Sequence, residues 1–169
     1  METFALTGRA VGVTGAGGHL GAEMTLALAR AGATVLALGR TMASLERVAD
    51  AAVAEGTPGA VLPFAADIQD EDATAAALDA LATRAGPVRG WVNDAYSGGA
   101  ASLLGDLDEE AVKATLDTGL AAVMTLTDRV AARMTSGGAI VNVSSMYGMV
   151  SPQPAAYRDH PAFHNPPAY

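Results

Sequence analysis

Short apolar runs alternate with longer segments of helical periodicity along most of this chain. The apolar runs predict strands at Ala10–Val13, Thr34–Leu38, Ala60–Ala66, Gly90–Asn93 and Ala139–Ser144. The segments between them predict helices at about Gly18–Ala31, Met42–Glu55, Glu71–Ala85 and Glu109–Met134. The strands lack strict alternation, which is typical of a parallel sheet covered on both faces. The pattern therefore predicts an α/β fold with a doubly wound parallel sheet, in a single domain spanning residues 1–169.

Composition and charge exclude several classes of function. A formal net charge of −8, without clustered Lys or Arg, argues against partners such as nucleic acid or an anionic membrane surface. The absence of cysteine excludes disulfides, thiolate catalysis and cysteine zinc sites. His160 and His164 have helical spacing, but Pro161 lies between them, so no metal site is expected. Without a signal peptide or a long apolar segment, the sequence predicts a cytoplasmic protein that does not enter a membrane.

The segment TGAGGHLG, Thr14–Gly21, joins the first predicted strand to the first predicted helix. Glycines let the backbone approach a phosphate closely, and the first N–H groups of a helix, together with its dipole, favour an anion. An ordinary tight turn is the alternative. The strand before the segment, the helix after it and the following strand indicate a Rossmann-like site for a dinucleotide diphosphate.

The last part of the chain has no regular period. From Ser151 onwards it reads SPQPAAYRDHPAFHNPPAY, rich in proline and aromatic residues. A long irregular segment in a compact domain is usually functional or disordered. Residues 145–169 are therefore expected to form an irregular loop at the active site.

Five motifs together resemble the short-chain dehydrogenases/reductases. They are TGAGGHLG, AADIQD (Ala65–Asp70), VNDAY (Val92–Tyr96), IVNVSSMYG (Ile140–Gly148) and NPPAY (Asn165–Tyr169). Their order and spacing follow the family over nearly the whole chain. The resemblance implies an NAD(P)-dependent oxidoreductase that transfers hydride between nicotinamide and a carbonyl/alcohol substrate.

The resemblance also implies which residues bind the cofactor. In the turn and at the helix start they are Gly15, Gly17, Gly18, His19, Leu20 and Gly21, with His19 in place of a glycine common in the family. Asp67 would hydrogen-bond the adenine and Ile68 would pack beside its ring, although Asp67 also fits a loop carboxylate. Asn93 and Ala95 match the family's Asn-Asn-Ala-Gly segment, in which Tyr96 replaces the glycine as either a packing residue or a substrate contact.

Cofactor choice depends on the end of the second predicted strand, where Gly39 precedes Arg40. NAD-preferring members place an acid there, whereas an arginine can bind a 2′-phosphate through its planar donors. Arg40 therefore favours NADP, with NAD possible, unless it is only a solvated residue at a helix start.

By the same resemblance, Ser145 holds the substrate oxygen and a tyrosine transfers the proton, with Ser144 as the near alternative to the serine. Tyr169, in NPPAY, is the preferred tyrosine, and Tyr157 is the other candidate. The family's lysine, which lowers the tyrosine pKa from near 10, does not follow Tyr169 in this sequence. Gly119 replaces an asparagine that organises a proton-relay water in many members.

These departures lead to an expectation for this polypeptide. The chain would be an N-terminal portion, truncated at the active-site tyrosine, that lacks the last strands and has weak or absent activity. Its fifth strand would then become an exposed sheet edge. A nucleotide-sugar epimerase or dehydratase of the extended branch is one alternative, because TGAGGHLG also fits its TGxxGxxG turn. A catalytically silent dinucleotide-binding module is the other. A homo-oligomer is possible, and the substrate is not predicted.

Overall fold

Five parallel strands form one sheet in the order β3-β2-β1-β4-β5. The computed structural model describes residues 4–96, 107–150, 153 and 155. The strands are β1 (Ala10–Thr14), β2 (Thr34–Gly39), β3 (Ala60–Ala65), β4 (Val88–Asn93) and β5 (Ala139–Asn142). The helices are α1 (His19–Arg30), α2 (Met42–Ala54), α3 (Glu71–Ala85), α4 (Glu109–Leu116) and α5 (Ala122–Arg133).

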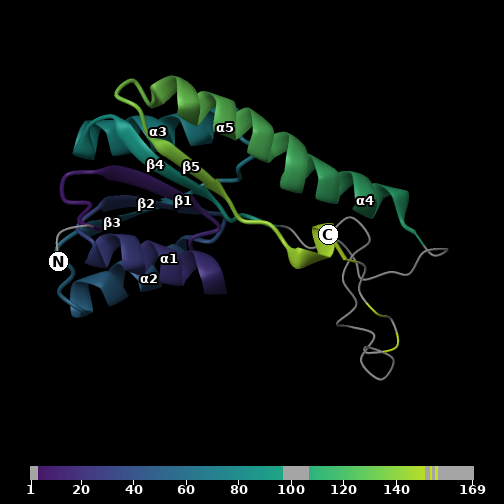
Figure 1. Ribbon diagram of the computed structural model, residues 1–169, viewed down its shortest axis with the longest axis horizontal. Helices are drawn as coiled ribbons and strands as arrows, with labels where there is room; N and C mark the ends of the chain where they lie inside the picture. The colour runs from purple at the N-terminus through teal and green to yellow at the C-terminus, as the bar shows by residue number, and fades with distance from the viewer. Residues whose placement is uncertain (1–3, 97–106, 151–152, 154, 156–169) are drawn as a thin grey trace.

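Helices cover both faces of the sheet, which confirms the predicted doubly wound architecture. Helices α1 and α2 lie on one face, and α3 and α5 lie on the other (Figure 1). One core cluster includes Leu36, Leu78, Trp91 and Leu126, between the sheet and the α3–α5 layer. The central strands β1 and β2 are buried because each face of the sheet supplies its own core.

A glycine in β1 makes room for the only tryptophan of the chain. A Cβ atom on Gly12 would lie 2.1 Å from Cζ3 of Trp91 in the neighbouring strand. The Trp91 indole is 1% exposed, and its Nε1–H donates to Oδ1 of Asn93 at 2.8 Å. This packing fixes the central strand pair just before the carboxyl end of β4.

Several predicted boundaries are wrong by one or two residues, and one helix is interrupted. Strand β4 begins at Val88 rather than Gly90, and β5 ends at Asn142 rather than Ser144. The predicted helix over 109–134 contains a π-helical turn at Asp117–Ala121, which separates α4 from α5. Gly119 lies in this turn.

Strand β5 forms one edge of the sheet, as expected. Among the described residues it pairs only with β4, and Val141 and Val143 are exposed. Within the predicted irregular segment, a short 3₁₀ turn forms at Met146–Gly148. No helix among the described residues is both long and apolar enough to cross a membrane.

Candidate cofactor and active site

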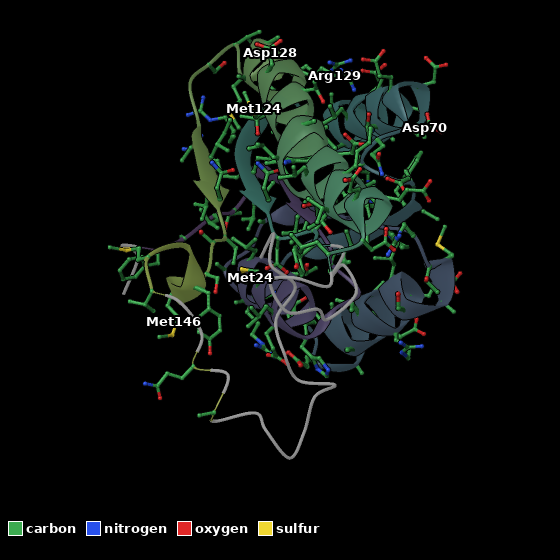
Figure 2. All side chains as sticks on the ribbon, turned by 90° about the vertical axis from the view of Figure 1, so that its right-hand side faces the viewer. Met24, Asp70, Met124, Asp128, Arg129 and Met146 are labelled. Carbon is green, nitrogen blue, oxygen red and sulfur yellow. The ribbon has the colours of Figure 1, made fainter. Side chains whose placement is uncertain are left out.

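The polar residues singled out in the sequence follow the carboxyl ends of the parallel strands. Figure 2 views the molecule from the end toward which the strands point, with Met24 of α1 and Met124 of α5 on opposite sides of the sheet. Parallel strands present all their carboxyl ends at one edge, where ligands bind in doubly wound folds. Hydrogen bonds at this edge join β1 and the turn after it to strand β2 and to the segment after β4.

Thr14 links the turn after β1 to the turn after β4. Its Oγ1 accepts hydrogen bonds from the backbone N–H groups of Asp94, at 3.1 Å, and Ala95, at 3.0 Å. On the other side, the Ala16 N–H donates to the Leu38 carbonyl oxygen at 3.1 Å. These bonds bring the predicted glycine turn against the ends of both neighbouring strands.

Glycine is required at several positions of the turn. Gly15 has a φ of +69°, and a Cβ there would lie 3.0 Å from the Ala95 backbone. A Cβ on Gly21 would lie 2.2 Å from the Gly15 carbonyl oxygen, and one on Gly17 would lie 2.2 Å from Oγ of Ser44. The turn is therefore too tight for side chains at these positions, and its backbone forms an open cradle.

Helix α1 begins with backbone donors that lack acceptors. Gly18, at its N-cap, makes no side-chain cap, and the first turn carries no acidic residue. Within the described residues, no acceptor is found for the N–H groups of Gly17, His19 and Leu20. Such orphan donors are normally satisfied by side chains, water or a ligand. Together with the glycine cradle, they fit the diphosphate of a dinucleotide.

The end of β2 lies beside this turn. Arg40 follows β2 directly and is exposed. Ser44, whose Oγ donates to the Thr41 carbonyl oxygen at 2.7 Å, is the residue that approaches Gly17. Arg40 thus lies on the segment that contacts the glycine turn.

The loop after β3 holds the predicted adenine-binding residues. Asp67 accepts the Gln69 N–H at 3.0 Å through Oδ1, so one oxygen already stabilises the local turn. Ile68 is 5% exposed and packs in the core with Leu78. Gln69 reaches the π-helical turn, where its Nε2 donates to Oγ1 of Thr118 at 3.1 Å. A role of Asp67 and Ile68 in adenine binding stays a prediction.

Asn93 ends β4 at the centre of a buried polar network. Its Nδ2 donates to Oγ1 of Thr127 at 2.9 Å and to Oδ1 of Asn142 at 2.7 Å, and its Oδ1 accepts from Trp91. The amide therefore ties β4 to β5 and to α5. This arrangement agrees with a supporting role for Asn93, while a direct contact with a cofactor stays a prediction for Asn93 and Ala95.

Ser145 lies just after β5, at the same edge of the sheet as the carboxyl ends of the other strands. Its Oγ accepts the Tyr147 N–H at 3.2 Å and so begins the 3₁₀ turn. The hydroxyl hydrogen remains able to donate to an oxygen of another molecule. Ser144 is exposed. Tyr157 and Tyr169 lie outside the described residues.

Two features of the site were missed in the sequence. Thr14 accepts hydrogen bonds from the backbone N–H groups of the two residues after β4. Its place at the start of the glycine motif could have indicated this role. No sequence signal indicated the hydrogen bond between Gln69 and Thr118. The two residues lie far apart in the chain, and the π-helical turn that contains Thr118 was predicted as regular helix.

The described chain also contains an apolar groove away from the glycine turn. The groove lies between α1 and β4–β5, lined in part by Leu28, Gly90 and Val141, and it contains none of the predicted site residues. No group of three or more potential metal ligands occurs among the described residues. His160 and His164 lie outside them.

Comparison with known proteins gives the family. Residues 9–158 match the short chain dehydrogenase family. D-erythrulose reductase of Gallus gallus is 38% identical over 159 residues, which are 92% of this chain and 58% of the relative. Human L-xylulose reductase is 39% identical over 151 residues, covering 86% of this chain and 56% of the relative.

Solved structures agree with these relatives. A short-chain dehydrogenase/reductase from Mycobacterium marinum superposes with a TM-score of 0.80 at 29% identity, covering 88% of this chain and 60% of that one. The present chain spans just over half the length of the curated relatives it matches. None of these matches favours the nucleotide-sugar epimerase alternative. The chain belongs to the short-chain dehydrogenase/reductase family.

Proposed function

We propose that this chain forms the cofactor-binding part of an NADP-linked oxidoreductase that interconverts a carbonyl and an alcohol. The observation that carries the proposal is the set of backbone N–H groups at the start of α1 for which no acceptor is found among the described residues, after a turn whose backbone leaves no room for a Cβ at Gly15 or Gly21. In this proposal the Gly15–Gly21 turn binds the diphosphate and Asp67 contacts the adenine. Asn93 and Ala95 support the part of the site that holds the nicotinamide.

The nicotinamide, when bound, supplies or accepts the hydride. Ser145 would hold the substrate oxygen through its hydroxyl hydrogen, because its oxygen already accepts from Tyr147. Tyr169 would give a proton to that oxygen during reduction and take it back during oxidation. These roles come from the match between the motifs of this chain and the family, together with the position of Ser145 after β5.

Arg40 supports NADP over NAD. It is exposed at the end of β2, next to the segment that contacts Gly17, and a guanidinium there can pair with a 2′-phosphate. The test compares the affinities for NADPH and NADH of wild type and of the Arg40→Ala and Arg47→Ala variants. Arg47 is the matched control, an exposed arginine within α2.

The expected result is a preference for NADPH that Arg40→Ala removes and Arg47→Ala leaves intact. A charge-assisted pair with phosphate contributes about 1.5–3 kcal/mol, or roughly a tenfold to hundredfold loss of NADPH affinity. A clear preference of the wild type for NADH would contradict the assignment of NADP.

The relatives suggest which carbonyl compounds to assay first. Two of them are named as reductases of the ketoses D-erythrulose and L-xylulose, at 38% and 39% identity. We therefore propose a small polar ketone as the substrate class. The assay follows NADPH oxidation with a panel of short ketoses, using Ser145→Ala as the variant expected to lose turnover while keeping cofactor affinity.

A catalytically silent binding module is the second candidate. Gly119, at the position of the family's asparagine, has no side chain and is exposed in the π-helical turn. Saturable cofactor binding without reduction of any ketone would favour this candidate. Measurable turnover by this polypeptide would remove it.

A further inference from the structure

Gln69 connects the loop after β3 to the long helical segment formed by α4, the π-helical turn and α5. Its backbone N–H donates to Oδ1 of Asp67 at 3.0 Å. Its side chain extends to the helical segment, where Nε2 donates to Oγ1 of Thr118 at 3.1 Å. One residue therefore links the carboxylate proposed to contact the adenine to the π-helical turn at Asp117–Ala121.

The loop after β3 is anchored on both sides of Gln69. Ile68 is 5% exposed and packs in the core. Asp70 caps α3, and its N–H donates to the Asp67 carbonyl oxygen at 3.0 Å. Gln69 itself is exposed, so it forms the tip of the loop, and its bond to Thr118 is the contact that holds this tip.

Asp67 keeps free acceptor positions for a ligand. An ionised carboxylate offers about four lone pairs on its two oxygens, and the Gln69 N–H occupies one of them on Oδ1. Because a carboxylate only accepts hydrogen bonds, the group of an adenine that it can bind is the exocyclic amino group, a donor. The direction of the Asp67 carboxylate therefore determines whether that amino group is recognised.

Thr118 provides a firm attachment because its helical segment is held to α3. Helix α5 lies along the sheet beside α3, and α4 extends past the carboxyl ends of the strands (Figure 1). Arg129 of α5 forms an ion pair with Glu71 at the start of α3. A second ion pair joins Arg133 to Asp79 at 3.3 Å. Loop, α3 and α5 are thus connected at several points, and Gln69 makes the connection nearest to Asp67.

We propose that Gln69 and Thr118 are positioning residues for adenine recognition. Their hydrogen bond holds the tip of the loop, and the Gln69 N–H in turn holds the Asp67 carboxylate in the direction of the adenine amino group. Both residues act through Asp67, without a contact of their own with the cofactor. This inference rests on the proposed cofactor site.

The experiment compares two cofactors that differ only in the base. Dissociation constants are measured by cofactor fluorescence for NADPH and for its hypoxanthine analogue, in which an oxygen replaces the adenine amino group. Gln69→Ala and Thr118→Val each remove one partner of the hydrogen bond, and Thr118→Ser keeps the hydroxyl. Thr125→Val is the matched control, because Thr125 Oγ1 bonds to the carbonyl oxygens of Ala121 and Ala122 in its own helical segment.

Wild type should bind NADPH about tenfold more tightly than the hypoxanthine analogue, which is the expected contribution of a hydrogen bond to a charged group. Gln69→Ala and Thr118→Val should each weaken NADPH binding by about twofold to tenfold. Their affinity for the analogue should not change, because the interaction that they support is absent there. The double variant should bind NADPH no more weakly than the weaker single variant. Thr118→Ser and Thr125→Val should match wild type.

The outcomes that contradict the inference are distinguishable from failure of the proposed function. Equal losses for both cofactors, or no loss, in folded Gln69→Ala and Thr118→Val would reduce the bond to a structural role and leave the cofactor site standing. Equal affinity of wild type for both cofactors would remove the adenine contact of Asp67, and this inference with it. A folded wild type that binds neither cofactor saturably overturns the proposed function itself. If one of the two variants does not fold, the other breaks the same bond and decides the result.

Discussion

A methyl group added at Gly21 tests whether the tight turn itself creates the phosphate cradle. In Gly21→Ala the new Cβ would lie 2.2 Å from the Gly15 carbonyl oxygen, 2.7 Å from the Gly15 carbonyl carbon and 2.9 Å from Cα of Ala16. All three atoms belong to the backbone and cannot rotate away. The turn must therefore move by about 1 Å to restore ordinary contact distances.

Two opposing terms set the change in stability. Overpacking costs about 1–3 kcal/mol, whereas replacing glycine by alanine in a helix gains up to about 1 kcal/mol. We therefore expect a net loss of about 0.5–2 kcal/mol in the free energy of unfolding. Because the shift displaces the donors at the start of α1, NADPH affinity should fall about tenfold or more, the equivalent of 1.4 kcal/mol.

The matched control is Gly119→Ala, where a new Cβ meets no heavy atom within 4 Å. It should gain about 0.5–1 kcal/mol from helix propensity and leave NADPH affinity unchanged. Urea unfolding followed by circular dichroism gives the stability, and cofactor fluorescence gives the affinity. Wild-type stability and affinity in Gly21→Ala would refute the argument that contact with Gly15 shapes the site.

Three further predictions concern the scaffold behind the site. Gly12→Ala places a Cβ 2.1 Å from the Trp91 ring, so it should lose about 1–3 kcal/mol and shift the fluorescence of the only tryptophan. Asp70→Ala removes the side-chain cap of α3 and should cost about 1 kcal/mol in urea unfolding, with unchanged cofactor affinity. Asn142→Ala removes an acceptor of the buried Asn93 amide and should cost about 1–3 kcal/mol, measured by thermal unfolding; an unchanged melting temperature would contradict the importance of this network.

The order and type of the elements could be predicted because each depends on local pattern. The apolar runs that became β1 and β2 are buried over nearly their whole length, so their hydrophobicity alone identifies them. The start of α3 could also be predicted, because Asp70 is a typical N-cap residue and accepts a hydrogen bond from the Ala73 N–H at 2.9 Å. The glycine turn was recognised because its glycines lie within seven residues of the sequence, Gly15–Gly21.

Features that depend on contacts between distant residues could not be predicted. The π-helical turn at Asp117–Ala121 interrupts a segment whose spacing predicts a regular helix. The hydrogen bond between Gln69 and Thr118 joins residues 49 positions apart, and nothing in the local sequence indicates it. The early end of β5 follows from its place at the edge, where one neighbour alone supplies hydrogen bonds.

The most direct test of the central claim is a titration of the ¹⁵N-labelled protein with NADPH, followed by two-dimensional NMR of its backbone amides. The account predicts saturable changes that are largest at the amides of Gly17, His19 and Leu20, which lack acceptors in the described structure. The amide of Gly119, in the exposed π-helical turn, should change little. A folded protein whose turn amides do not respond, or whose largest changes lie away from the start of α1, would contradict the assignment of the phosphate site.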